Sequence, residues 1–163
     1  MALFGSARDI RMFKSTTREL VEDIVSQQIG YYKIRLGDTR ANVYGESMTK
    51  YFIGPVLISC LIDRGDFEVE GTDYGPDSIR KVDFRFFKDH LVEANVFPEI
   101  GDVIMYNEDY YEVDNVNENQ LILGKNPDYS YSPGLENFGR SYCIILATHY
   151  SSPDKLGITQ ERL

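Results

Sequence analysis

The sequence is poor in the residues that build metal and cofactor sites. It contains only two cysteines and two histidines among 163 residues. His90 and His149 are about sixty positions apart, and neither has a cysteine or carboxylate near it at a familiar metal-ligand spacing. We therefore expect each histidine to have a packing or surface role, and we expect no bound metal or cofactor.

Motifs of catalysis are also missing. The chain contains no glycine-rich loop that would cradle a phosphate, no nucleophile elbow and no zinc-binding helix motif. Carboxylates are numerous, but the sequence alone places no pair of them across a pocket. We therefore expect a protein that is not an enzyme.

The two cysteines lie inside apolar runs, at residues 57–62 and 142–146. A reduced cysteine in such a run behaves as a small hydrophobic residue, so we predict that Cys60 and Cys143 are core thiols. A disulfide between them also remains compatible with the sequence. Because no secretory apolar segment precedes the domain and no run approaches membrane-spanning length, we expect a soluble protein made in the cytoplasm.

Basic residues are outnumbered, and the two signs of charge are unevenly placed. The formal net charge is −9, which argues against a nucleic-acid-binding surface because such surfaces need clustered lysine and arginine. Residues 99–118 hold seven acidic and no basic side chains, whereas residues 8–50 hold eight basic and six acidic ones. This asymmetry favours oriented or complementary surfaces.

The clearest structural pattern is a hairpin over residues 98–116. Residues 103–106 form an apolar run of strand length, and residues 107–109 have turn chemistry. Tyr111 and Val113 then alternate with polar neighbours, which predicts a strand with one buried face. A second turn at 117–119 and a third strand at 120–123 are expected to complete a meander. A β-core is therefore the predicted centre of the fold.

A helix is expected to precede this core. Thr16 and Glu19 form a capping-box pattern, and an apolar stripe follows that ends near Gly30, so the sequence predicts a helix over residues 16–29. Residues 1–15 form an N-terminal arm whose pattern fits either a loose segment or a short helix. The remaining predicted elements are strands at 32–36, 56–62 (as a central strand), 67–70, 82–86 and 141–148, a loop at 71–77, and one or two helical turns at 87–95.

The predicted fold class is mainly β: an antiparallel β-barrel or sandwich of about seven strands, with an N-terminal helix and long connecting loops. Residues 16–150 are expected to form a single β-rich domain, and residues 151–163 a tail outside the core.

One long connection has the composition of a contact surface. Residues 124–140 are rich in glycine, proline and serine, yet they include Tyr129, Tyr131 and Phe138. Loops of this length inside a compact domain are usually functional or disordered, and disordered segments are poor in aromatic residues. We therefore predict that these three aromatic side chains contact a partner.

The order of features resembles the neck or head-closure (head completion) proteins of contractile-tailed, T-even-like bacteriophages. In that family a helix and an aromatic strand are followed by an Asn-rich turn, a Gly-Asp hairpin with an aromatic-Glu return, and an Asp-aromatic pair before a glycine. The matching segments here are residues 20–29, 31–34, 42–46, 101–104 with 110–113, and 128–134. The middle region is shorter here than in the longer members of the family.

The resemblance implies a structural virion protein at the head-tail neck. Copies would form a homo-oligomeric ring, a hexamer or dodecamer, that connects the DNA-filled head to the tail and lets DNA pass through its lumen. Its partners would be portal or adaptor proteins and tail terminator or tail completion proteins, with DNA only as non-specific cargo and no membrane. The alternative is a monomeric β-barrel module that binds a small molecule or glycan, with Tyr129, Tyr131 and Phe138 as a stacking platform.

In such a ring, the acidic hairpin is a candidate wall of the lumen. Negative side chains at Glu108, Asp109, Glu112 and Asp114 would repel DNA and keep it mobile, whereas basic contacts would hold it by counterion release. The alternative is that these four carboxylates only solvate the outward face of the meander.

Overall fold

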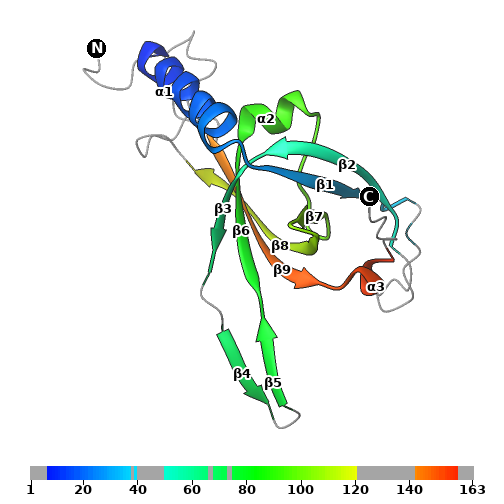
Figure 1. The fold of residues 1–163 in the computed structure, drawn as a ribbon. Helices are drawn as coiled ribbons and strands as arrows, with labels where there is room; N and C mark the ends of the chain where they lie inside the picture. The colour runs from blue at the N-terminus through cyan, green and yellow to red at the C-terminus, as the bar shows by residue number, and fades with distance from the viewer. Residues whose placement is uncertain are drawn as a thin grey trace.

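Figure 1 shows the protein as a computed structural model, which describes residues 7–37, 39, 50–65, 68–72, 75–120 and 142–157. The predicted antiparallel β fold with an N-terminal helix is confirmed. The elements are, in chain order, α1 (Ala7–Glu19), η1 (Leu20–Val25, a π-helix), β1 (Gln28–Ile34), β2 (Phe52–Ser59), β3 (Leu61–Arg64), β4 (Glu68–Thr72), β5 (Gly75–Ile79), β6 (Lys81–Phe87), α2 (Lys88–Glu93), β7 (Val103–Tyr106), β8 (Asp109–Gln120), β9 (Cys143–Ser151) and α3 (Pro153–Leu156).

Seven strands form one curled sheet in the order β2-β1-β7-β8-β9-β6-β3. The two outer strands, β2 and β3, are consecutive in the chain and are separated only by Cys60. The chain therefore leaves one edge of the sheet and joins the other edge at once, which requires the sheet to bend round on itself. The result is an open, barrel-like sheet, from which α1 projects at one end and the β4–β5 hairpin at the other (Figure 1).

The concave side of this sheet contains the main core. Side chains from β1, β6, β7, β8 and β9 meet there, and α2 covers part of it through Leu91. Strand β6 shows the alternation that its sequence predicts, because Val82, Phe84 and Phe86 are buried while Lys81 and Arg85 are exposed. The core members are Ile29, Tyr31, Ile58, Cys60, Val82, Phe84, Phe86, Leu91, Val96, Ile104, Tyr111, Val113, Ile144 and Leu146.

A second, smaller cluster lies apart from the main core. Val103, Tyr110 and Leu156 form it, and Leu156 on α3 is only 1% exposed. The expectation that the C-terminal tail lies outside the core is therefore wrong for Leu156. The reason is local: Pro153 starts a short helix and Gly157 ends it in the left-handed region, which turns one leucine back onto the sheet.

The β7–β8 hairpin forms where the sequence predicts it, but its second strand is longer. Asn107 and Glu108 both have positive φ, as a two-residue type I′ turn requires. Strand β8 then continues to Gln120 against β9, so the predicted turn at 117–119 is wrong. The polar run at that point is accommodated instead by irregular pairing between Asn117 and Gln120.

The prediction that residues 56–62 form a central strand is wrong. These residues contribute instead to β2 and β3, the two edge strands of the sheet. Pro55 suits an edge strand, because proline has no N–H to donate to a further strand. Gly54 lets β2 approach β1 closely, since a Cβ there would lie 2.6 Å from the Tyr31 carbonyl oxygen. Cys60 then donates its backbone N–H to Gln27 (3.0 Å) where the chain changes edges.

Both cysteines are free, so the structure contains no disulfide between them. Strand β6 lies between them: Cys143 is on β9, which pairs with one side of β6, and Cys60 directly precedes β3, which pairs with the other side. Two strand spacings of about 4.8 Å exceed the Cα separation of a disulfide. Burial raises the pKa of the Cys60 thiol to about 12, as expected for a core thiol.

The N-terminal helix begins nine residues before the predicted start, at Ala7 rather than Thr16. The capping-box pair therefore lies inside the helix, and the N-terminal arm is helical from residue 7 onward. The helix also ends earlier than predicted, because Ser26 adopts the left-handed conformation and donates its N–H to the Val21 carbonyl. Ile29 consequently belongs to β1. The predicted loop at 71–77 also differs from the structure, since residues 68–72 and 75–79 pair as the strands β4 and β5.

Asp102 is fully buried and joins β1 to the start of the β7–β8 hairpin. Its carboxylate accepts hydrogen bonds from the Tyr31 hydroxyl (2.5 Å) and the Lys33 ammonium (3.1 Å). It also accepts the backbone N–H groups of Ile34 (2.8 Å) and Glu99 (2.8 Å). Burial and the nearby carboxylate raise the pKa of Tyr31, so this hydroxyl keeps its proton and remains a donor.

We expect Asp102→Ala to lower the free energy of unfolding by about 3 kcal/mol, because it leaves buried donors without an acceptor. The matched control is Asp63→Ala, which removes an exposed carboxylate that pairs with Arg85 and should cost less than about 1 kcal/mol. Urea unfolding measures both changes. Equal losses in the two variants would show that Asp102 does not hold β1 to the hairpin.

Candidate functional site

The predicted contact aromatics Tyr129, Tyr131 and Phe138 lie outside the described residues, so their role stays a prediction. The same is true of the Asn-rich turn at 42–46.

The four carboxylates of the acidic hairpin have different surroundings. Glu112 forms an ion pair with Lys50, Asp114 with His149 (2.8 Å), and Asp109 with Arg80 (3.9 Å). Asp114 is also the extra residue of an irregularity in β8, which separates it from the alternation of the strand. Three of the four carboxylates therefore face a basic side chain or a histidine of the same chain. Glu108 occupies the exposed tip of the turn.

The two histidines lie apart and have different environments. His149 is half-buried and faces Asp114. His90 is buried on α2, with Nε2 3.0 Å from a Glu22 carboxylate oxygen, but the direction of this contact does not suit a hydrogen bond. Its Nδ1 has no hydrogen-bond partner among the residues that the structure describes. The described residues contain no group of three potential metal ligands. The expectation that neither histidine binds metal remains a prediction.

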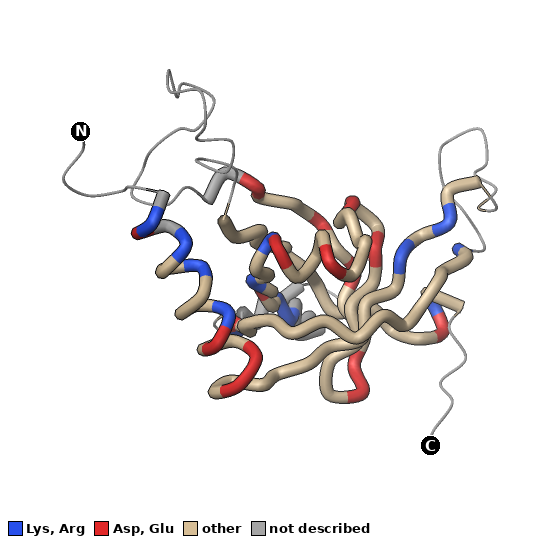
Figure 2. Tube along the Cα trace, turned by 90° about the horizontal axis from the view of Figure 1, so that it is seen from above, with Lys and Arg blue, Asp and Glu red and all other residues tan. Residues whose placement is uncertain are grey.

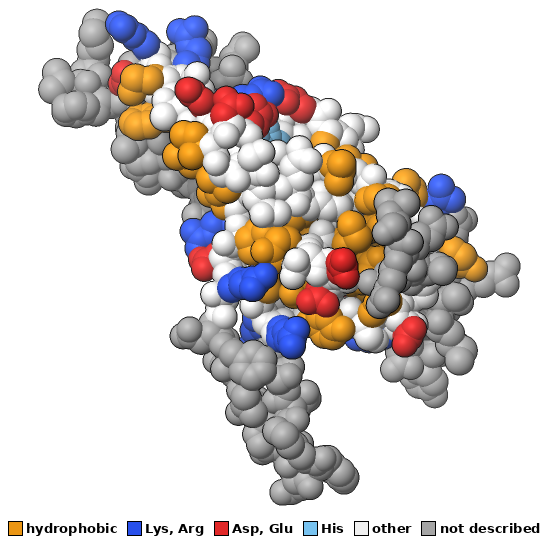
Figure 3. Space-filling view, in the orientation of Figure 1, with side chains coloured by type: hydrophobic (Ala, Val, Ile, Leu, Met, Phe, Trp, Pro, Cys, Tyr) orange, Lys and Arg blue, Asp and Glu red, His pale blue; other side chains and the backbone are white. Residues whose placement is uncertain are grey.

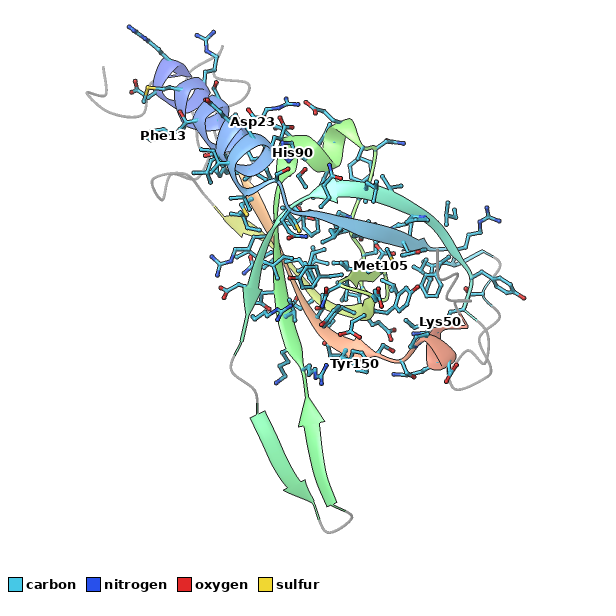
Figure 4. The ribbon with its side chains drawn as sticks, in the orientation of Figure 1. Phe13, Asp23, Lys50, His90, Met105 and Tyr150 are labelled. Atoms are coloured by element: carbon cyan, nitrogen blue, oxygen red, sulfur yellow. The ribbon has the colours of Figure 1, made fainter. Side chains whose placement is uncertain are left out.

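The most prominent uncovered surface runs along the N-terminal helix. Phe13, Leu20 and Ile24 are seven and four residues apart, so they share one side of the helix. They are exposed, and Ile24 has 74% of its surface accessible to solvent. Figure 3 shows hydrophobic side chains in orange along this helix, and Figure 4 shows Phe13 on α1. We call Met12, Phe13, Leu20, Ile24 and Val25 the helix stripe.

The helix is held to the body mainly by charged contacts. Lys14 pairs with Asp89 (2.9 Å), and Arg18 pairs with Glu93 (2.8 Å) on α2. Val21 is the one buried apolar residue of η1. Figure 2 shows basic residues along α1; Arg18 lies in its last turn, and the acidic Glu22 and Asp23 follow in η1. Because surface ion pairs contribute only about 0–1 kcal/mol each, the isolated chain gives this helix weak support.

A second apolar surface follows the edge strand β2. Ile53, Val56 and Leu57 are exposed there, and β2 pairs with β1 on one side only within the seven-stranded sheet. An edge strand with apolar side chains is a template for contact with another chain. Sequence reasoning missed this surface because the same apolar run predicted a central strand. It also missed the helix stripe, since an amphipathic pattern does not reveal whether its apolar side faces the core or a partner.

Comparison with known proteins gives no family. No family model and no curated protein matches the sequence. Among solved structures, a chain in the virion of a native gene transfer agent particle is similar, with a TM-score of 0.44 and 7% identity over 77% of this chain and 94% of that chain. A likeness at this level carries no argument about function.

Within the part of the chain that the structure describes, no helix has the length and apolarity needed to cross a membrane.

A matched pair of alanine variants tests how the helix is held. Val21→Ala should lower the free energy of unfolding by about 1–2 kcal/mol, because Val21 is 2% exposed. Ile24→Ala should change it by less than about 0.5 kcal/mol. Urea unfolding of the purified chain measures both. A larger loss for Ile24→Ala than for Val21→Ala would mean that the helix stripe is covered within the chain itself.

Proposed function

We propose that this chain is a structural virion protein of a phage neck. Copies form a ring that connects the DNA-filled head, on its portal side, to the tail, and DNA passes through the lumen. The order of sequence motifs supports this proposal, and so does the absence of catalytic motifs from the sequence. The observation that carries it is the helix stripe, because a projecting helix with exposed apolar side chains needs a neighbour to cover it.

A ring supplies such a neighbour to every copy. Ring interfaces are heterologous, so each subunit offers two different surfaces to its two neighbours. The helix stripe and the exposed side chains of β2 are two apolar surfaces of this kind. Additional contacts above and below the ring would join portal or adaptor proteins to tail terminator or tail completion proteins.

The alternative is a monomeric module that binds a small molecule or glycan. The described interior of the barrel-like sheet is filled by core side chains, so such a ligand would need a site outside it. The two functions differ in oligomeric state. Light scattering after size exclusion, with and without portal and tail proteins, should show a ring or a complex for the neck protein and a monomer throughout for the module.

Charge substitution in the helix stripe tests the neck function directly. Ile24→Asp should fold normally, because the side chain is exposed, but it should lower incorporation into phage particles by at least about tenfold by placing a charge in an apolar contact. Asp154→Asn, at an exposed position on α3 far from this helix in the sequence, is the control and should assemble. Normal incorporation and infectivity of the Ile24→Asp variant would contradict the use of this helix in assembly.

The acidic hairpin as a wall of the lumen remains a prediction. Glu108→Lys combined with Asp109→Lys should slow DNA ejection in assembled particles, because cations at the lumen would hold phosphates. The control is Asp154→Lys, at an exposed position on α3. If the double variant assembles normally and ejects DNA as fast as the parent, the hairpin belongs on an outer surface.

A further inference from the structure

A cationic cleft lies at the end of the barrel-like sheet from which the β4–β5 hairpin projects. It has a volume of about 390 Å³, within the usual range for ligand sites. Strands β3 and β6 form one wall and the β7–β8 turn forms the other. Its described lining residues are Arg64, Gly65, Arg80, Lys81, Val82, Asn107, Asp109 and Tyr111.

Aromatic rings support the two arginines of this cleft. The Arg64 guanidinium lies 5.2 Å from the centre of the Tyr106 ring and donates a hydrogen bond to the Tyr106 hydroxyl (3.2 Å). The Arg80 guanidinium lies 5.9 Å from the centre of the Tyr150 ring, and Figure 4 shows Tyr150 near the base of the hairpin. Stacking on an aromatic face leaves the edge of a guanidinium available to an oxyanion and limits its loss of entropy on binding.

The charge of the cleft is not balanced by its own described acidic residue. Asp109 is the single carboxylate among the described lining residues and pairs with Arg80 at 3.9 Å, so one acidic side chain stands against the three basic side chains of Arg64, Arg80 and Lys81. Figure 3 shows basic side chains in blue close to where the β4–β5 hairpin leaves the body. A local cationic cleft in a chain with a net charge of −9 is a place where an anion of limited size would concentrate.

We propose that this cleft binds the carboxylates of a short acidic segment of a neighbouring protein. Arg64 and Arg80 are the recognition residues, since planar guanidinium groups bind carboxylates bidentately. Nucleic acid fits less well, because Asp109 and Glu108 lie beside the cleft and would repel a continuous phosphate backbone. The inference stands on the cleft alone and does not depend on a role in the neck.

The proposal also agrees with a lumen lined by the neighbouring acidic turn. A cleft filled by a partner's carboxylates presents no bare guanidinium to DNA that passes Glu108. The same contact would fix the orientation of the partner, because charge pairs across an interface set its register.

The test uses fluorescein-labelled hexaglutamate and the purified full-length chain at low ionic strength, with binding followed by fluorescence anisotropy. Unlabelled inorganic phosphate and a single-stranded oligonucleotide of similar charge serve as competitors. We expect the oligonucleotide and phosphate to compete more weakly than unlabelled hexaglutamate, and added salt to weaken binding.

Paired variants identify the site. Arg64→Gln combined with Arg80→Gln should weaken hexaglutamate binding by at least about tenfold, and Asp109→Asn should strengthen it. Arg85→Gln, on the same strand β6 as Lys81 but paired with Asp63 outside the cleft, should leave binding within about twofold of the parent. Circular dichroism checks that each variant folds.

Three results would overturn the proposal. They are no measurable binding of hexaglutamate by the parent chain, binding that the double arginine variant retains, and stronger competition by the oligonucleotide than by hexaglutamate. The last result would identify the cleft as a nucleic-acid contact. None of these results bears on the neck function, which is tested separately by the incorporation of the Ile24→Asp variant into particles.

Discussion

The hydrogen bonding of the buried Asp102 carboxylate is the interaction on which the arrangement of the sheet depends. One carboxylate satisfies donors from β1 and from the segment that leads into β7, so two parts of the chain about seventy residues apart must meet at one point. The neighbouring backbone fits this geometry, because Gly101 has positive φ and donates its N–H to the Val113 carbonyl. Strand β1 therefore has a fixed position beside β7, and β2 follows it to the edge of the sheet.

The change of edge at Cys60 explains the shape of the whole molecule. Because β2 and β3 are consecutive but lie at opposite edges, the sheet must bend, and its concave side holds the main core. The elements that do not enter this core, α1 and the β4–β5 hairpin, project from the two ends (Figure 1). Exposed apolar side chains on α1 and β2, together with the cationic cleft at the base of the β4–β5 hairpin, then give the chain several distinct surfaces for neighbours, as a ring subunit needs.

Sequence periodicity predicted the elements whose partners are close in the chain or whose alternation is strong. The β7–β8 hairpin, β6 and the short helix after it belong to this group, because turn chemistry and period-two burial act locally. Predictions that needed tertiary information were wrong. Residues 56–62 were predicted as a central strand because most of them are apolar, but in the folded chain they divide between the two edge strands, and Val56 and Leu57 are exposed. The Thr16 capping pattern did not reveal the longer helix, whose Lys14 and Arg18 form ion pairs with α2. The cleft was also not predictable, since Arg64, Arg80 and Asp109 meet only when the sheet curls.

Imaging of intact phage particles, with this chain located by a tag or by its fitted structure, tests the neck function most directly. A neck protein should appear as a ring of copies at the head-tail junction, with DNA on its axis and the helix stripe covered by the adjacent copy. A particle in which the chain lies away from that junction, or in which the helix from Ala7 to Val25 faces solvent in every copy, would contradict it.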